Sequence, residues 1–155
     1  MHISTQSKIR KASVKPYVNW LKLELNITKT KVKLWMDWKP DNLYEAFPDS
    51  RRVVIPIPEC DWSFLVALHE IGHVSTGERT HTYLSEYNAE RWAIARAKES
   101  YGIYSQDYVD DAKEYVKLHL INNLMYSRLK IDKVKAYVLD WLGTTAANIN
   151  SEINN

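Results

Sequence analysis

Apolar positions in the second half of the chain recur at helical spacing, and no proline interrupts them. All five prolines lie within residues 1–58, so the rest of the chain lacks the strongest helix breaker. Helices are expected over residues 61–76, 83–100, 107–126 and 131–142. Asp61 is the expected N-cap of the first of these helices, and Gly77, Gly102 and Gly143 follow periodic stretches, where helices commonly end.

The first half of the chain shows a different pattern. Apolar residues at helical spacing over residues 14–25, with Pro16 in the opening turn, predict an N-terminal helix. Residues 32–38 alternate in polarity and residues 52–55 form a short apolar run, so both are expected as strands. Residues 40–50, rich in Pro, Asp and Asn, would form a broad hairpin loop between them. The predicted fold class is α+β, a mainly helical domain with a small antiparallel β-sheet before the helix over 61–76.

Composition fits one domain. The chain has 155 residues, of which 45% are hydrophobic and 26% are charged, so we expect a single domain over residues 1–155, with residues 1–15 as a flexible basic arm. The longest uncharged apolar stretch is far shorter than the roughly 20 residues of a membrane helix. The N-terminus does not resemble a secretory signal, and Cys60 has no second cysteine to pair with. These features predict a cytoplasmic protein with no membrane contact.

The net charge of +2 hides an asymmetry along the chain. Residues 1–40 hold nine basic and two acidic residues, whereas residues 41–155 hold twelve basic and seventeen acidic ones. A basic face of this kind attracts nucleic acid through long-range electrostatics. One hypothesis is therefore a nucleic-acid-binding module that uses the basic N-terminal quarter.

The chemistry is carried by a His-Glu-x-x-His motif inside the first of the predicted long helices. His69 and His73 are four residues apart, so both imidazoles lie on one helical face and can reach one metal ion. Glu70 is turned toward a water on that ion and is the candidate general base. A catalytic zinc site usually has three protein ligands and keeps the fourth position for water. The sequence therefore predicts one Zn²⁺ per chain and requires a third ligand.

Four downstream residues are candidates for that third ligand: Glu78, His81, Glu86 and Glu90. Glu86 is favoured, because an antiparallel helix pair joined near residues 77–82 would place it level with His73. His81 is the alternative ligand. Glu90 lies one turn further along the same face as Glu86, where it can orient a ligating histidine.

Small residues should allow these two helices to approach closely. Ala89, Ala93 and Ala97 continue beside the face that carries Glu86, and Gly72 leaves room for another backbone beside the motif helix. Trp92, Trp141 and Tyr115 fall on apolar helical faces and are expected in the core.

Two segments of the chain resemble the gluzincin metallopeptidases. One is the His-Glu-x-x-His motif, and the other is Glu86-Tyr87-Asn88-Ala89-Glu90-Arg91-Trp92-Ala93. In these enzymes a glutamate on the following helix is the third zinc ligand. Within that group the residues are most similar to the small ImmA/IrrE-like proteins of bacteria, phages and mobile elements. The resemblance covers about residues 52–97 and implies a zincin-like fold and a protein or peptide substrate, often a repressor-like regulator.

The chemistry expected from the residues agrees with peptide hydrolysis. Zinc lowers the pKa of a bound water and polarises the scissile carbonyl, while Glu70 transfers the proton. A donor to the developing oxyanion is also required. The candidates for this donor are Tyr83, Tyr87, His119 and Tyr126.

A non-catalytic alternative uses the same zinc site. The ion would then only stabilise a small regulatory or phage structural protein that acts by binding a partner. Loss of zinc should unfold such a protein, and changing Glu70 should leave its role intact. The two hypotheses therefore differ in what they require of Glu70.

Overall fold

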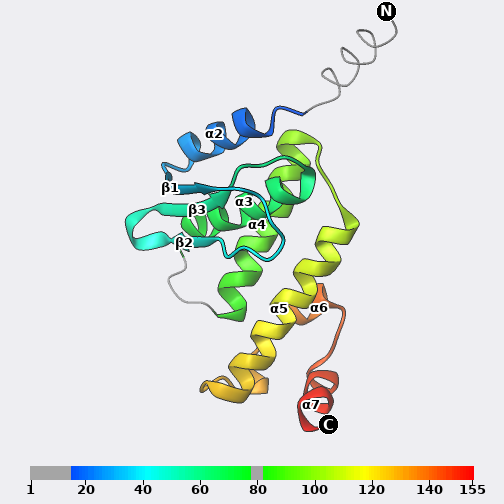
Figure 1. Ribbon diagram of the computed structural model, residues 1–155. Helices are drawn as coiled ribbons and strands as arrows, with labels where there is room; N and C mark the ends of the chain where they lie inside the picture. Colours follow the sequence, from blue (N-terminus) through cyan, green and yellow to red (C-terminus); the bar gives the residue numbers. More distant parts are fainter. Residues whose placement is uncertain (1–14, 78–81) are drawn as a thin grey trace, which may run out of the picture.

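The computed structural model describes residues 15–77 and 82–155, and its fold class is α+β (Figure 1). One helix precedes a small three-stranded sheet, and helices dominate the rest of the described chain. The elements are α2 (Tyr17–Ile27), β1 (Lys31–Met36), β2 (Glu45–Phe47), β3 (Arg52–Pro56), α3 (Asp61–Thr76), α4 (Tyr83–Tyr101), α5 (Gln106–Tyr126), α6 (Ala136–Leu142) and α7 (Ala146–Asn154). The alternative ligand His81 and all of the expected basic arm except Lys15 lie outside the described residues.

The sheet is mixed, so the prediction of a small antiparallel sheet was wrong. β3 lies in the centre, with β1 parallel to it on one side and β2 antiparallel to it on the other. The expected broad loop therefore contains a strand, and it also contains a short 3-10 turn over Pro48–Ser50. Alternating polarity does not show which strand is the partner or in which direction it runs. Residues 37–44 carry the chain past the end of β3, which permits the parallel pairing.

The three long helices begin and end within one residue of their predicted positions. Gly77, Gly102 and Gly143 follow helix ends with φ near +70°, which confirms their predicted role as helix terminators. The prediction for the N-cap of α3 was wrong by one residue. Cys60 is the N-cap: its sulfur accepts the backbone N–H of Ser63, whose hydroxyl accepts the N–H of Cys60. Asp61 is the first helical residue instead.

The C-terminal region differs from the single helix expected over residues 131–142. A 3-10 turn occupies Ile131–Lys133, and α6 begins only at Ala136. α7 was not predicted, because its only buried residue is Ile149 and its apolar pattern is correspondingly sparse. Short helices of this kind depend on tertiary packing more than on their own sequence.

The core surrounds α3, which contacts the sheet, α2 and α4 (Figure 1). Ala89, Ala93 and Ala97 of α4 are fully buried, as predicted from their size. Gly72 of α3 packs against the backbone of Ala89, so the predicted close approach of the two helices is confirmed. A second apolar cluster joins α5 to α6, α7 and the start of α4; its buried members are Tyr83, Val116, Leu120, Val134, Val138 and Ile149.

Two of the three aromatic residues assigned to the core pack there. Trp92 and Trp141 are partly buried against the core clusters, and Trp141 contacts both of them. Tyr115 is 40% exposed, so its assignment to the core was wrong. Its ring lies instead beside the candidate site.

Within residues 15–77 and 82–155, every helix is too short or too polar to cross a bilayer.

Candidate metal centre

Three side chains from two helices converge on one point. His69 and His73 lie one turn apart on α3, and Glu86 lies in the first turn of α4. The Nε2 atoms of the two histidines are 3.1 Å apart. Oε2 of Glu86 lies 3.0 Å from Nε2 of His69 and 3.1 Å from Nε2 of His73. The three atoms form a nearly equilateral triangle, and Glu86, the residue favoured as third ligand, completes it.

Local sequence signals bring the two helix ends together. Gly77 ends α3 one turn after His73, through N–H bonds to the carbonyls of His73 and Val74. Thr82 and Ser85 form a reciprocal capping box that starts α4, so Glu86 falls in its first turn. A carboxylate in that position is stabilised by the positive end of the helix dipole.

The donor set fits a metal ion. In a tetrahedral zinc site with bonds of about 2.0 Å, two ligand atoms lie about 3.3 Å apart, close to the edges of this triangle. Hydrogen bonds alone cannot account for all three short distances in this cluster. Each histidine can donate one proton from Nε2, so at most two of the three atom pairs can be hydrogen-bonded. A cation at the centre uses the lone pairs of all three atoms. His69, His73 and Glu86 are almost fully buried, as is usual for ligands held by a folded scaffold.

Glu70 adjoins the triangle without completing it. It belongs with His69 and His73 to a buried group whose ligand atoms all lie within 4.8 Å of one another, so this group could also hold a metal ion. Its Oε1, however, is 3.8 Å from Nε2 of His69, whereas Oε2 of Glu86 is only 3.0 Å from that atom. By these distances Glu86 is the better candidate for a third ligand, and Glu70 would lie beside an ion held there.

The electrostatics of the cluster favour positive charge between the rings. Burial lowers the pKa of His69, but Glu90, Glu86 and Glu70 raise it by more, so this pKa lies well above its usual value. Burial alone would raise the pKa of Glu86, but the hydrogen bonds and charges of His69 and His73 lower it strongly. The carboxylate of Glu86 is therefore ionised at neutral pH, as a metal ligand must be.

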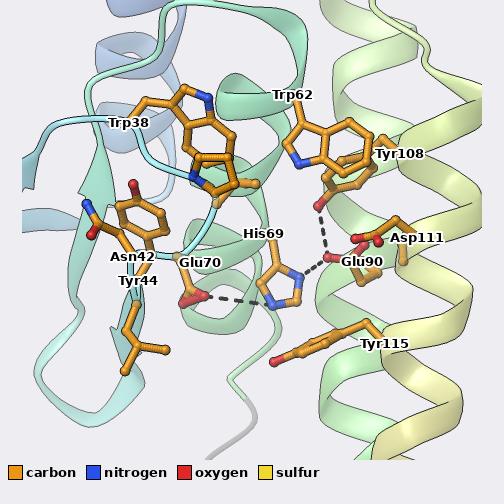
Figure 2. A pocket seen from close by; sticks show the side chains of 14 residues that line it. Trp38, Asn42, Tyr44, Trp62, His69, Glu70, Glu90, Tyr108, Asp111 and Tyr115 are labelled. Atoms are coloured by element: carbon orange, nitrogen blue, oxygen red, sulfur yellow. Dashed lines mark hydrogen bonds and ion pairs between the residues drawn. The ribbon is translucent and has the colours of Figure 1, made fainter.

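Glu70 is a buried carboxylate at the wall of a pocket. This pocket lies beside His69 (Figure 2). Burial, partly offset by the two histidines, raises the pKa of Glu70. A carboxylate with a raised pKa accepts a proton more readily at neutral pH.

Glu90 and Tyr108 hold the far side of the His69 ring. Oε1 of Glu90 lies against Nδ1 of His69 and also accepts a hydrogen bond of 3.0 Å from the hydroxyl of Tyr108 (Figure 2). Glu90 thus lies where the sequence predicted an orienting carboxylate. Because Nδ1 faces this carboxylate, its proton can be held there, which leaves the lone pair of Nε2 free for a metal.

Three of the four expected oxyanion donors lie away from the site. The Tyr83 hydroxyl accepts the backbone N–H of Lys135, and the Tyr87 ring packs on Tyr137 and Trp141. Tyr126 is 80% exposed near the end of α5. None of these three residues lines the pocket beside His69, and their role as oxyanion donor stays a prediction.

The fourth candidate, His119, packs against Tyr115. The rings of these two residues are 4.7 Å apart, and the Tyr115 ring lies 6.0 Å from that of His69. Tyr115 itself lines the pocket with Glu70 (Figure 2). Burial and nearby carboxylates raise the pKa of Tyr115, so its hydroxyl stays protonated and can donate a hydrogen bond. Tyr115 is thus a further candidate for the oxyanion donor, and of the five tyrosine and histidine candidates it is the one that lines the pocket.

The pocket has a volume of about 260 Å³ and opens beside the metal centre. Besides His69 and Glu70, its walls come from the segment after β1, the start of α3 and one face of α5 (Figure 2). Most of these wall residues were not predicted from the sequence as part of a site: Trp38, Tyr44, Trp62, Tyr108, Asp111 and Tyr115. A signal was present in Tyr108, Asp111 and Tyr115, whose spacing places them on one face of a predicted helix.

No family model, curated protein or solved structure matches this chain.

Proposed function

We propose that this protein is a zinc-dependent metallopeptidase that hydrolyses peptide bonds of a specific protein substrate. The observation that carries this proposal is the triangle of His69, His73 and Glu86, with Glu70 beside it at the edge of an open pocket. Three protein ligands next to a solvent-connected pocket are typical of catalytic zinc sites, whereas structural sites usually have four protein ligands.

The reaction divides among the residues of the site. A zinc ion held by His69, His73 and Glu86 would act as a Lewis acid toward a water and a peptide carbonyl. Glu70 takes a proton from the attacking water and delivers it to the leaving amine. The Tyr115 hydroxyl donates a hydrogen bond to the oxyanion that develops on the carbonyl.

The motif itself gives a second line of support. The resemblance to small ImmA/IrrE-like proteins suggests a zincin-like fold, one zinc per chain and a repressor-like regulator as substrate. A cytoplasmic location agrees with such a substrate and belongs to the same proposal. The small pocket next to the metal centre suggests that the enzyme recognises only a few substrate residues directly.

A stabilising role for the metal is the second candidate. An ion bound between α3 and α4 would join the two central helices of the fold, so its removal should also reduce stability. A metal that only stabilises the fold would not need a carboxylate such as Glu70 at the wall of a pocket. The nucleic-acid hypothesis rests on the basic N-terminal quarter, residues 1–40, of which residues 1–14 lie outside the described part of the chain, and it stays a prediction.

The test is the variant Glu70→Gln, compared with wild type after reconstitution with zinc. Fluorescein-labelled casein and a mixture of random-sequence peptides serve as substrates. We expect Glu70→Gln to keep its zinc and to lose cleavage, because glutamine cannot accept the proton. Glu99→Gln, an exposed change on α4, is the matched control and should cleave normally. Cleavage retained by Glu70→Gln would contradict the mechanism.

A further inference from the structure

One end of the pocket is built from two indole rings and a carboxylate. Trp38 follows β1, Trp62 lies in the first turn of α3, and Asp111 projects from α5 (Figure 2). All three line the pocket that contains His69 and Glu70, and with Pro40 they also line a second hollow that adjoins it. This end of the pocket is therefore continuous with the candidate catalytic site.

Both indoles are held in place by neighbouring groups. The Trp38 ring stacks on Tyr44 with centroids 6.0 Å apart. The Tyr44 hydroxyl donates to the carbonyl of Asp37 at 2.9 Å and accepts the N–H of Lys39 at 3.0 Å, which fixes the turn around Trp38. Trp62 packs edge-on against Tyr108, with centroids 5.2 Å apart. The aromatic walls are thus preorganised for a ligand.

The charge of this end of the pocket is uncompensated within the described residues. Asp111 is exposed and forms no ion pair or hydrogen bond with any of them, and none of the residues that line the pocket is Lys or Arg. Oε2 of Glu90 is buried at the pocket wall and lacks a hydrogen-bond partner in the described chain. Partial burial and the charges of Glu90 and Glu114 raise the pKa of Asp111, in keeping with the excess of carboxylates around it.

We propose that this end of the pocket binds the side chain of a lysine or arginine of the polypeptide substrate, against Trp38 and Trp62 and paired with Asp111. Tryptophan is the best partner for cation–π interactions, and a nearby carboxylate adds charge pairing. The volume of about 260 Å³ is below the roughly 300–1,000 Å³ of pockets for whole small molecules, so it suits a single side chain.

A purely apolar side chain would fit the walls less well, because it would desolvate Asp111 without supplying a partner. The basic residue would lie next to the scissile bond, since the same pocket reaches Glu70 and His69. This inference rests on the proposed peptidase function in one respect, namely that the bound chain is a substrate. The binding of a basic side chain can be measured without cleavage.

The test uses zinc-loaded Glu70→Gln protein and fluorescein-labelled peptide mixtures with random flanking residues. The central residue is lysine, arginine or norleucine, which keeps an apolar stem but lacks the charge. Fluorescence anisotropy should show that lysine and arginine peptides bind about tenfold more tightly than norleucine peptides. Asp111→Asn and Trp38→Leu should each remove most of this preference.

Asp110→Asn is the matched control, because it removes the same charge one position earlier on α5 from a residue that does not line the pocket. It should keep the full preference for basic peptides, and circular dichroism should show all variants folded. Equal or tighter binding of norleucine peptides would overturn the proposal, as would an equal loss in Asp110→Asn.

The outcome is separable from that of the proposed function. If no peptide is cleaved by wild type but the basic preference depends on Asp111 and Trp38, the binding proposal stands and the peptidase proposal fails. If wild type cleaves peptides without preference for a basic residue, only the binding proposal fails.

Discussion

Gly72 packs directly against the backbone of Ala89. A Cβ atom on Gly72 would lie 2.9 Å from the carbonyl oxygen of Ala89 and 3.2 Å from its Cα, closer than side-chain carbons normally approach. His73 follows Gly72, and Glu86 precedes Ala89 by less than one helical turn. The spacing of α3 and α4 at this point therefore sets the distance between His73 and Glu86, two of the three proposed metal ligands.

Gly72→Ala should reduce both stability and metal affinity. Alanine gains about 1 kcal/mol in helix propensity, but separating the helices costs about 1–3 kcal/mol through overpacking. Guanidinium unfolding and zinc titration measure the two effects. Gly102→Ala is the control, because a Cβ there meets no atom within 4 Å and the only strain is the positive φ of 66°. Its free energy of unfolding should fall, but its affinity for zinc should equal that of wild type. Unchanged zinc affinity in Gly72→Ala would refute this account of the helix contact.

Glu90→Ala should weaken zinc binding without removing a ligand. Its carboxylate contacts Nδ1 of His69 and is itself held by Tyr108. Loss of such an orienting partner typically lowers metal affinity about 10- to 100-fold. Competition with a chelator measures the affinity, and Glu99→Ala, exposed on the same helix, should match wild type. An affinity equal to that of wild type in Glu90→Ala would show that His69 needs no such support.

Tyr115→Phe should slow peptide cleavage while leaving zinc content unchanged. Removing one hydrogen-bond donor to a developing oxyanion lowers kcat by about 10²-fold or more, and KM should change little. Tyr126→Phe removes the same hydroxyl from an exposed position on α5 and should have no effect. A normal kcat in Tyr115→Phe would exclude Tyr115 as the donor.

Stability should fall at alkaline pH through Tyr101. Its hydroxyl donates to Glu24, a fully buried carboxylate that Arg96 also binds, and burial and Glu24 raise the pKa of Tyr101. Because the folded-state pKa exceeds the unfolded value of about 10, this contribution is complete below that pH and declines above it.

Tyr101→Phe should therefore cost about 1–2 kcal/mol at pH 8, the usual effect of leaving a buried acceptor short of a donor. Its unfolding free energy should then fall less steeply than that of wild type between pH 9 and pH 11. Urea unfolding at a series of pH values measures both slopes. If the unfolding free energies of wild type and Tyr101→Phe fell with the same slope between pH 9 and pH 11, the contact with Glu24 would not raise the pKa of Tyr101 as described.

The helices and the convergence of His69, His73 and Glu86 were predictable because their signals are local. Glycine terminators and helical periodicity defined α3 and α4, and two helix ends joined by a short link bring His73 level with Glu86. The burial of Glu24 could not be predicted in the same way, because its partners Arg96 and Tyr101 lie more than seventy residues away along the chain.

The pocket was not predictable for a related reason. Trp38 belongs to a turn whose position depends on the parallel pairing of β1 with β3, and alternating polarity does not encode that direction. Tyr115 lies on a helical face that is apolar in sequence, yet part of that face lines the pocket beside His69 instead of the core. Which part of an apolar face is covered depends on tertiary packing.

The most direct test of the metal centre is the zinc content of reconstituted wild type, Glu86→Ala and His81→Ala, measured by elemental analysis after dialysis. Wild type and His81→Ala should hold one zinc per chain, and Glu86→Ala should lose most of it, because one corner of the triangle is gone. Circular dichroism would show that each variant is folded. Full zinc occupancy in Glu86→Ala, or none in wild type, would contradict the assignment of His69, His73 and Glu86 as the metal ligands.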